Sequence, residues 1–254
     1  MNPTPPLPRQ QWSKLSEWIH TFALGLWGAL FLFYWHSGKL GLLIHPNYFA
    51  LSIGAGFVLL AIASLNLLRM IRRQMGWRES HQTLFSPLLM SCILLVAAIM
   101  GFLIAPRPFV SDTAIQRGLQ DSAIVTRVRP QSFRVNRSSE SRSLIDWIRT
   151  IDVYPEPDAY AGQKVSVDGF VVRDPNLPAG YFTLTRFVIT CCAADVYPVG
   201  LPVRFTQSKS EIPADRWFKV RGKMATETLK GKRQVAIQAS TVQPIPEPKN
   251  PYAY

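Results

Sequence analysis

The chain has 254 residues, of which 48% are hydrophobic and only 17% are charged, and its formal net charge is +12. Soluble domains carry about 25% charged residues, so this composition argues against both a disordered chain and an ordinary soluble domain. Three cysteines are too few for a disulfide framework, and the fold must therefore depend on burial of apolar side chains. The positive charge is typical of proteins that bind nucleic acid or a membrane surface.

Three stretches of the N-terminal part lack Asp, Glu, Lys and Arg: 18–38, 40–68 and 80–106. Each stretch is long enough for a membrane-spanning helix, which needs about 20 mostly apolar residues. We therefore predict a membrane domain over residues 1–106 with three transmembrane helices, near 18–35, 48–68 and 87–105. A cleaved signal peptide is the alternative for the first stretch, but its apolar run is too long and no small-residue cleavage site follows it.

Lysine and arginine in the short flanking segments predict the orientation. The N-terminal tail carries Arg9 and Lys14, the first loop carries only Lys39, and the second loop carries four arginines between 69 and 78. Because basic residues concentrate on the cytoplasmic side, the tail and the second loop should be cytoplasmic. We thus expect a multi-pass protein of the plasma membrane with a cytoplasmic N-terminus and an extracytoplasmic C-terminal domain.

Small residues recur at four-residue spacing in the first two predicted helices. Gly25 precedes Ala29, and Ser52 precedes Gly56. Such pairs allow close helix contacts in a membrane, either within this chain or with a partner membrane protein.

The remainder of the chain predicts a separate, mostly β domain. Residues 107–140 have the composition of a connector, 141–243 contain a helix followed by strands, and 244–254 form a Pro-rich tail. The apolar stripe of Ser141–Ile151 predicts the helix. Alternation and turn residues predict five strands, at Lys164–Arg173, Phe182–Thr190, Val199–Thr206, Trp217–Lys223 and Val235–Val242.

Five short strands in about 80 residues favour a small antiparallel barrel of the oligonucleotide/oligosaccharide-binding (OB) type. The fold class is then an α+β membrane protein, with transmembrane helices followed by an OB-like extracytoplasmic domain. A small open sandwich is the alternative.

The positive charge is spread along the C-terminal part. Residues 107–254 hold 21 of the 28 basic and 14 of the 16 acidic residues, a net charge of +7. No compact basic run with interleaved aromatic residues is present, so we do not expect nucleic acid as a partner. Attraction to the head groups of membrane lipids is the favoured interpretation.

The most unusual string of the sequence contains two adjacent cysteines, Cys191 and Cys192, followed by Asp195. Thiolates and carboxylates both ligate ions such as zinc, so these three residues are candidate metal ligands that need a fourth ligand from elsewhere. Two other interpretations stay open: buried cysteines pack as small hydrophobes, and adjacent cysteines can form a strained, easily reduced disulfide.

His36 and His45 flank the short loop between the first two predicted helices. In the predicted topology this loop faces the same compartment as the cysteine pair, so both histidines are candidate ligands of a shared metal site or of a hand-over path. The alternative is that they simply lie at the membrane interface. His20, in the first helix, and His81, in the second loop, are expected to lie away from this site.

Enzyme signatures are absent from the sequence. It contains no Gly-x-Ser-x-Gly, no phosphate-binding Gly-rich loop and no His-Glu-x-x-His. Cys92, in the third predicted helix, is expected to pack. We therefore do not expect an enzyme, although a thiol-redox enzyme that uses Cys191 and Cys192 is an alternative.

Seven segments of the sequence resemble one bacterial family, the YcgQ-like predicted subunits of two-component permeases. They are His36–Leu40, Ile44–Pro46, Asp146–Arg149, Tyr154–Lys164, Val167–Val171, Phe187–Asp195 and Gly200–Val203. The resemblance covers most of the chain, from about Trp18 to Val242, and the segment with the two cysteines is its most distinctive part.

The resemblance implies a membrane-anchored accessory subunit that pairs with a separate multi-spanning permease, and a barrel-like extracytoplasmic domain. We expect this domain to bind substrate or a metal ion, or to gate the permease. It also implies a link to metal homeostasis, with zinc as the candidate cofactor. A tethered metal- or thiol-binding module without transport is the alternative function, and a homo-oligomer is left open.

Overall fold

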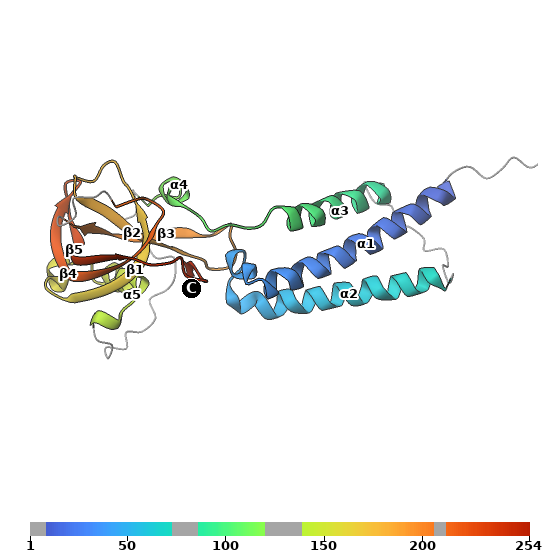
Figure 1. Cartoon of the computed structure of the whole chain (residues 1–254), viewed down its shortest axis with the longest axis horizontal. Coiled ribbons are helices and arrows are strands. Elements are labelled where there is room, and N and C mark those ends of the chain that lie inside the picture. Colours follow the sequence, from blue (N-terminus) through green and yellow to red (C-terminus); the bar gives the residue numbers. More distant parts are fainter. Residues whose placement is uncertain (1–8, 73–85, 120–138, 206–211) are drawn as a thin grey trace, which may run out of the picture. The chain divides into compact units, whose positions relative to one another are not determined.

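The computed structural model describes residues 9–72, 86–119, 139–205 and 212–254. The chain forms two compact units, Met1–Arg107 and Pro108–Tyr254 (Figure 1). The predictions for the N-terminal tail before residue 9, for most of the second loop including His81, for most of the connector and for Thr206 lie outside the described residues.

The N-terminal unit contains three long helices, α1 (Arg9–His36), α2 (Phe49–Ile71) and α3 (Pro87–Leu103). Two short 3₁₀ turns, η1 (Lys39–Leu42) and η2 (Pro46–Tyr48), link α1 to α2. Local sequence sets the ends of α3. The hydroxyl of Ser86 accepts a hydrogen bond from the N–H of Leu89 at 3.3 Å, and Pro87 begins the helix.

Helix α1 packs against both α2 and α3 and lies between them (Figure 1). The backbones of α1 and α2 approach closely at Gly28, where an added Cβ would lie 2.8 Å from the carbonyl oxygen of Gly56. The indole N–H of Trp27 donates to the carbonyl of Leu94 at 3.0 Å, and the hydroxyl of Tyr34 donates to the carbonyl of Gly101. These bonds attach α1 to α3, since hydrogen bonds between helices add to packing in an apolar environment.

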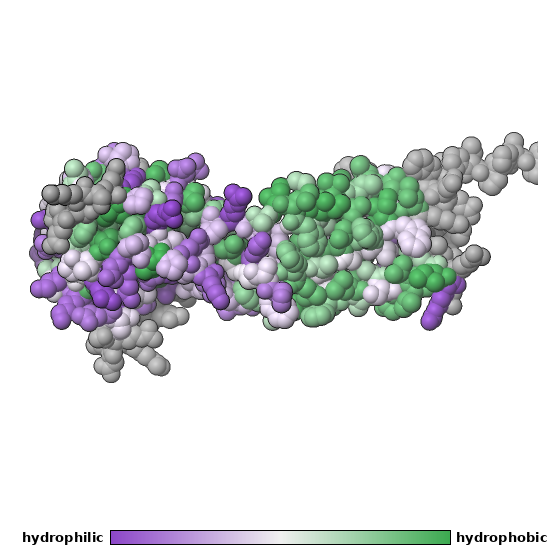
Figure 2. Space-filling view, in the orientation of Figure 1, coloured by the Kyte–Doolittle hydropathy of each residue, from purple (hydrophilic) through white to green (hydrophobic). Residues whose placement is uncertain are grey.

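The outer surface of the helical unit is apolar. Of the 27 large hydrophobic side chains exposed in the described residues, 23 belong to residues 15–104, and Figure 2 shows a mostly green surface along the helices. Soluble monomers rarely expose apolar patches of this extent. The surface of this unit therefore fits an apolar surrounding.

Two of the helical segments are long and apolar enough to span a membrane, Leu15–His36 and Pro46–Ile71. The third, α3, has 17 residues, or about 26 Å at 1.5 Å per residue, against a hydrocarbon core of about 30 Å. It ends at Leu103 because Ile104 is extended and Pro106 follows. Length and composition thus support two spans of the three predicted.

In its described residues, the C-terminal unit contains two α-helices and six strands. Its helices are α4 (Ser111–Gln116) and α5 (Leu144–Val153). Its strands are β1 (Lys164–Val172), β2 (Tyr181–Val188), β3 (Tyr197–Arg204), β4 (Trp217–Leu229), β5 (Lys232–Pro244) and β6 (Tyr252–Ala253). The helix predicted at 141–151 and the five predicted strands are all present, with β4 and β5 longer than expected.

The strand pairings run in a closed circuit. The sheet order is β1-β4-β5-β3-β2-β6, and β1 also pairs with β2, so each of the first five strands is hydrogen-bonded to two of the others. The prediction of a purely antiparallel sheet is wrong, because β3 pairs with β5 and β2 pairs with β6 in parallel. Both parallel pairs join strands far apart in sequence, which local patterns do not reveal.

Helix α5 lies against the core of this sheet. Its apolar stripe buries Leu144, Trp147 and Ile148 to an exposed fraction of 1% or less. A capping box fixes its start: Ser143 accepts a hydrogen bond from the N–H of Asp146, and the Asp146 carboxylate accepts one from the N–H of Ser143. The apolar stripe that predicts this helix is therefore the face that the structure buries.

The C-terminal residues are not only an extended tail. Tyr252 and Ala253 pair with Phe187 and Val188 at the end of β2, and the Tyr252 side chain is almost fully buried. This sixth strand therefore supports the stretch of chain that directly precedes the two cysteines.

Candidate functional site

The loop that contains the two cysteines connects β2 to β3. We call residues 189–196 the cysteine loop. It begins where β2 ends at Val188, and its first N–H, that of Ile189, donates to the carbonyl of Ala253 at 3.0 Å. The cysteine pair thus lies outside the regular strand, so the alternation of side chains between the two faces of a strand does not extend to it.

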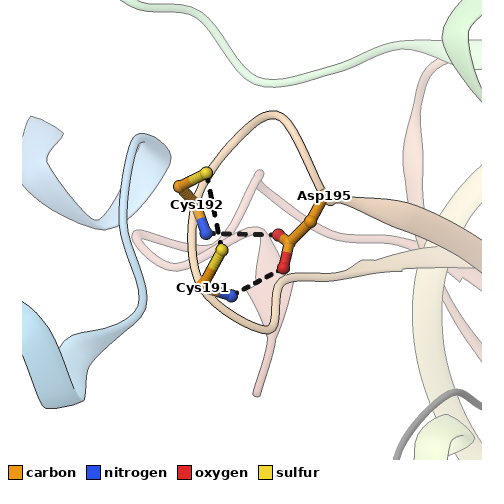
Figure 3. Close-up of side chains that lie close together, drawn as sticks. All are labelled: Cys191, Cys192 and Asp195. Carbon is orange, nitrogen blue, oxygen red and sulfur yellow. Dashed lines mark hydrogen bonds between the residues drawn. The ribbon is translucent and has the colours of Figure 1, made fainter.

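The Asp195 carboxylate holds the loop in a tight turn. It accepts hydrogen bonds from the N–H of Cys191 at 2.8 Å and from the N–H of Cys192 at 3.2 Å (Figure 3). The hydroxyl of Thr190 donates to the same carboxylate, and the N–H of Asp195 donates to the carbonyl of Cys192 at 3.0 Å. Side-chain bonds of this kind replace backbone pairing in a turn, so Asp195 determines the shape of the loop.

The same turn brings two sulfur atoms together. The Sγ atoms of Cys191 and Cys192 lie 3.6 Å apart, within hydrogen-bonding distance, and are not joined by a disulfide. Cys191 is exposed and Cys192 is half-buried. The interpretation of Cys191 as a buried packing residue therefore does not fit. One ligand atom from each of Cys191, Cys192 and Asp195 lies within 4.8 Å of the others.

The charge of Asp195 controls the protonation of the site. Hydrogen bonding of the Cys191 thiol to Asp195, and then to Cys192, raises the pKa of this thiol to about 11. Although partial burial opposes ionisation of the carboxylate, hydrogen bonds from Thr190 and Cys191 prevail and lower the pKa of Asp195 to about 2. Near neutral pH the site therefore holds a carboxylate beside a protonated Cys191 thiol. A bound cation would stabilise the deprotonated form of this thiol.

The positively charged side chain of Arg117 also contacts the cysteine loop. The guanidinium of Arg117 donates to the carbonyl of Val196 and, at 3.4 Å, to that of Ala193. It also lies over the ring of Phe109, 4.9 Å from the centroid. Arg117 follows α4, which the hydroxyl of Ser111 ties to β1 by donating to the carbonyl of Val171 at 3.2 Å.

Sequence reasoning did not identify Arg117 or Thr190 as part of this site. Arg117 lies in the segment predicted as a connector, and no motif links it to a loop more than 70 residues further along the chain. Thr190 directly precedes the cysteines, and a hydroxyl residue five positions before an aspartate at a strand end is a signal that could have identified it.

The two candidate histidines belong to the other unit. His36 ends α1, and His45 precedes η2. The Nδ1 atom of His45 accepts a hydrogen bond from the N–H of Asn47 at 3.1 Å and so caps this turn. Capping explains His45 without a metal, and the idea of a site shared between His36, His45 and the cysteine loop stays a prediction.

Family models cover most of the chain. The model of the DUF1980 N-terminal domain matches residues 19–120, and that of the DUF1980 C-terminal domain matches residues 138–254. The second match includes the whole cysteine loop. A search of curated proteins finds no relative.

Proposed function

We propose that this chain, which belongs to the DUF1980 family, is a membrane-anchored accessory subunit of a two-component permease and that its cysteine loop binds a thiophilic divalent metal ion. The observation that carries the proposal is the convergence of two thiols and a carboxylate, with ligand atoms within 4.8 Å of one another. All three belong to one turn of the chain, so little ordering is needed on binding.

Zinc fits this donor set. Zinc binds cysteine sulfur at about 2.3 Å with tetrahedral geometry, which places two sulfur ligands about 3.8 Å apart. The two sulfur atoms of the loop are 3.6 Å apart before any ion is bound. Oδ1 of Asp195 accepts the N–H of Cys192, and a carboxylate oxygen carries a second lone pair for a metal.

Three ligands from the chain leave a fourth position for water, substrate or a residue of another protein. A bound zinc ion would supply Lewis acidity and a positive charge. In an accessory subunit the open position would let the ion be passed on, because a closed four-ligand site binds its metal structurally. Cys191, Cys192 and Asp195 would hold the ion, and Thr190 and Arg117 would position the loop.

The membrane part of the proposal rests on the apolar helical unit. We infer that α3 joins the other two helices as a third span, because its hydrogen bonds to α1 place it in the same helical layer. The asymmetry of basic residues supports a C-terminal unit that lies outside the cytoplasm. The described parts of the three spans carry no charged residue between 18 and 38, 40 and 68, or 86 and 106, whereas ion pathways are marked by such residues. A partner would therefore form the pathway.

The β unit fits an OB-type barrel. Its closed circuit of five strands, with β3 parallel to β5, supports the proposal of a five-stranded barrel of this type. In this proposal the barrel is a rigid support for the cysteine loop, which connects β2 to β3.

Zinc binding by the full chain tests the metal site. The protein is purified in a neutral detergent, stripped with a chelator and titrated with zinc against a chromophoric competitor. We expect one zinc per chain, and at least tenfold weaker binding in Cys191→Ser, in Cys192→Ser and in Asp195→Asn. Cys92→Ser, which removes a thiol from α3, is the matched control and should bind as the wild type does. Equal binding by all four variants, or no binding by the wild type, would reject the site.

Copurification distinguishes the transport role from a tethered binding module. The full chain is expressed with an affinity tag in its native cells, and membranes are solubilised in a mild detergent. A stoichiometric multi-spanning membrane protein in the eluate supports the accessory-subunit role. Recovery of the chain alone, or as a homo-oligomer that binds zinc, supports the tethered module.

A further inference from the structure

A groove on the C-terminal unit, separate from the cysteine loop, is rich in positive charge. It is an open groove of about 730 Å³, which is within the usual size range of ligand sites. Its floor is formed by neighbouring parts of β1, β4 and β5, and Glu140 lies at its rim. Its polar side chains include Lys164, Ser166, Arg221, Lys223 and Gln238. We call it the cationic groove.

Strand register places the basic residues of the groove on one face. Lys164 pairs directly with Lys223, and Ser166 pairs directly with Arg221. Val165, between Lys164 and Ser166, is 2% exposed and points into the core, so its neighbours point outward. The groove therefore presents three cations side by side on two adjacent strands.

A bulge deepens the floor beside these residues. Arg221 pairs with Thr241 while Gly222 pairs with Ala239, which leaves Ser240 as an extra residue of β5. The hydroxyl of Ser240 donates to the carbonyl of Arg221 at 3.1 Å. An added Cβ at Gly222 would lie 2.1 Å from the carbonyl oxygen of Gln238, so only glycine allows the two strands to approach so closely. Bulges of this kind often lie next to binding sites.

The cross-strand pair of lysines is unfavourable for folding alone. Directly opposite side chains have Cβ atoms about 5 Å apart, and like charges in that position destabilise a sheet. Glu140 lies 3.5 Å from Lys164, but both side chains are more than half exposed, and such ion pairs contribute little. A bound anion would turn this repulsion into attraction.

The chemistry of the groove defines the kind of anion. Three cations and one carboxylate leave a net charge of +2, which matches a phosphate monoester dianion. The lining contains no aromatic residue, whereas nucleic-acid bases are bound by stacking on aromatic side chains. Lysine and arginine N–H groups, with serine and glutamine, provide many donors for oxygen atoms. We propose that the cationic groove binds a phosphate-bearing ligand through its charged oxygens.

This inference does not depend on the proposed metal site, and the experiment keeps the two apart. The full chain is purified in a neutral detergent, stripped of metal with a chelator, and carries Cys191→Ser so that phosphate cannot bind to a metal. Inorganic phosphate, glycerol phosphate and a short-chain phosphatidic acid, a lipid whose head group is a phosphate monoester, are titrated into it by calorimetry at low ionic strength. The first two probes report a free phosphate compound, and the third reports a lipid head group.

Charge-matched variants test whether the groove itself binds. The groove variant combines Lys164→Gln, Arg221→Gln and Lys223→Gln, and we expect it to bind at least tenfold more weakly than its parent. The control variant removes two lysines and one arginine outside the groove, by Arg216→Gln, Lys232→Gln and Lys249→Gln, and we expect a change of less than twofold. Thermal unfolding checks the fold, and the groove variant should unfold no earlier than its parent because the repulsion is removed.

A substitution of Glu140 should change the binding affinity of the groove in the opposite direction. Glu140→Gln removes the carboxylate of the groove and should tighten binding about threefold, as expected for a partly exposed charge. The inference is overturned if none of the three probes binds, if the groove and control variants weaken binding equally, or if Glu140→Gln weakens it. Binding of the lipid probe alone assigns the site to head groups, and binding of the free compounds assigns it to soluble phosphate.

Discussion

Removal of the Asp195 charge should make the Cys191 thiol more reactive. Asp195→Asn keeps a side-chain oxygen that can accept the N–H groups of Cys191 and Cys192. It replaces the charged acceptor of the Cys191 thiol, whose hydrogen bond is the first cause of the raised pKa, and it removes the negative charge that adds to the shift. The pKa of this thiol should therefore fall from about 11 toward the ordinary value of 9.0. The expected effect on alkylation follows from the thiolate fraction.

Below the pKa, each unit of fall gives about tenfold more thiolate, while the intrinsic nucleophilicity falls about threefold because the Brønsted coefficient is near 0.5. A fall of one to two units thus predicts alkylation about three- to tenfold faster at pH 8. The hydrogen bond from the thiol to Cys192, the second cause of the raised pKa, sets the lower end of this range.

The assay is iodoacetamide labelling of the chelator-treated full chain in detergent, followed by mass spectrometry with fragment ions that separate Cys191 from Cys192. Cys92, which lies in α3, is the internal reference. Glu247→Gln, which removes one exposed carboxylate elsewhere in the same unit, is the matched control and should label at the wild-type rate. Labelling of Cys191 in Asp195→Asn at or below the wild-type rate would refute the assignment of the pKa shift to Asp195.

Three further predictions follow from the described contacts. Because Cys191 must lose a proton to bind a metal and its pKa is about 11, zinc affinity should rise at least tenfold per pH unit between pH 6.5 and 8.5; a flat competition titration would exclude Cys191 as a ligand. Arg117→Gln should speed amide hydrogen exchange of residues 191–196 about fivefold, because the charged donor to Val196 is lost; unchanged exchange by mass spectrometry would show that Arg117 does not order the loop. Gly28→Leu should lower the stability of the helical unit by about 1–3 kcal/mol through overpacking, whereas Gly54→Leu, with no atom within 4 Å of its added Cβ, should not; equal melting temperatures in detergent would contradict the packing of α1 on α2.

Local signals explain what the sequence could predict of the fold. The sequence predicts helix α5 because the apolar stripe of Ser141–Ile151 is a local pattern, and it predicts the five longer strands because alternation and turn residues are local. Strand β6 was not predicted, since two residues carry no periodicity and Tyr252 is strand only through its partner Phe187. The parallel pairing of β3 with β5 has the same nonlocal origin.

The candidate site was predicted by residue type but not by geometry. Two adjacent cysteines and a nearby aspartate indicate possible ligands, yet sequence alone left packing, metal binding and a redox pair open. The turn that brings the sulfurs to 3.6 Å depends on the inward-facing carboxylate of Asp195 and on the donors of Thr190 and Arg117. The small-residue pattern was likewise informative but incomplete: it identified Gly56, whereas the residue that meets Gly56 is Gly28.

The most direct test of the central claim is X-ray absorption at the zinc edge on the full chain loaded with one equivalent of zinc in detergent. The account predicts two sulfur neighbours at about 2.3 Å together with lighter oxygen or nitrogen neighbours at about 2.0–2.2 Å, and one sulfur neighbour in Cys192→Ser. A spectrum without sulfur neighbours, or one unchanged by this substitution, would contradict metal binding by the cysteine loop.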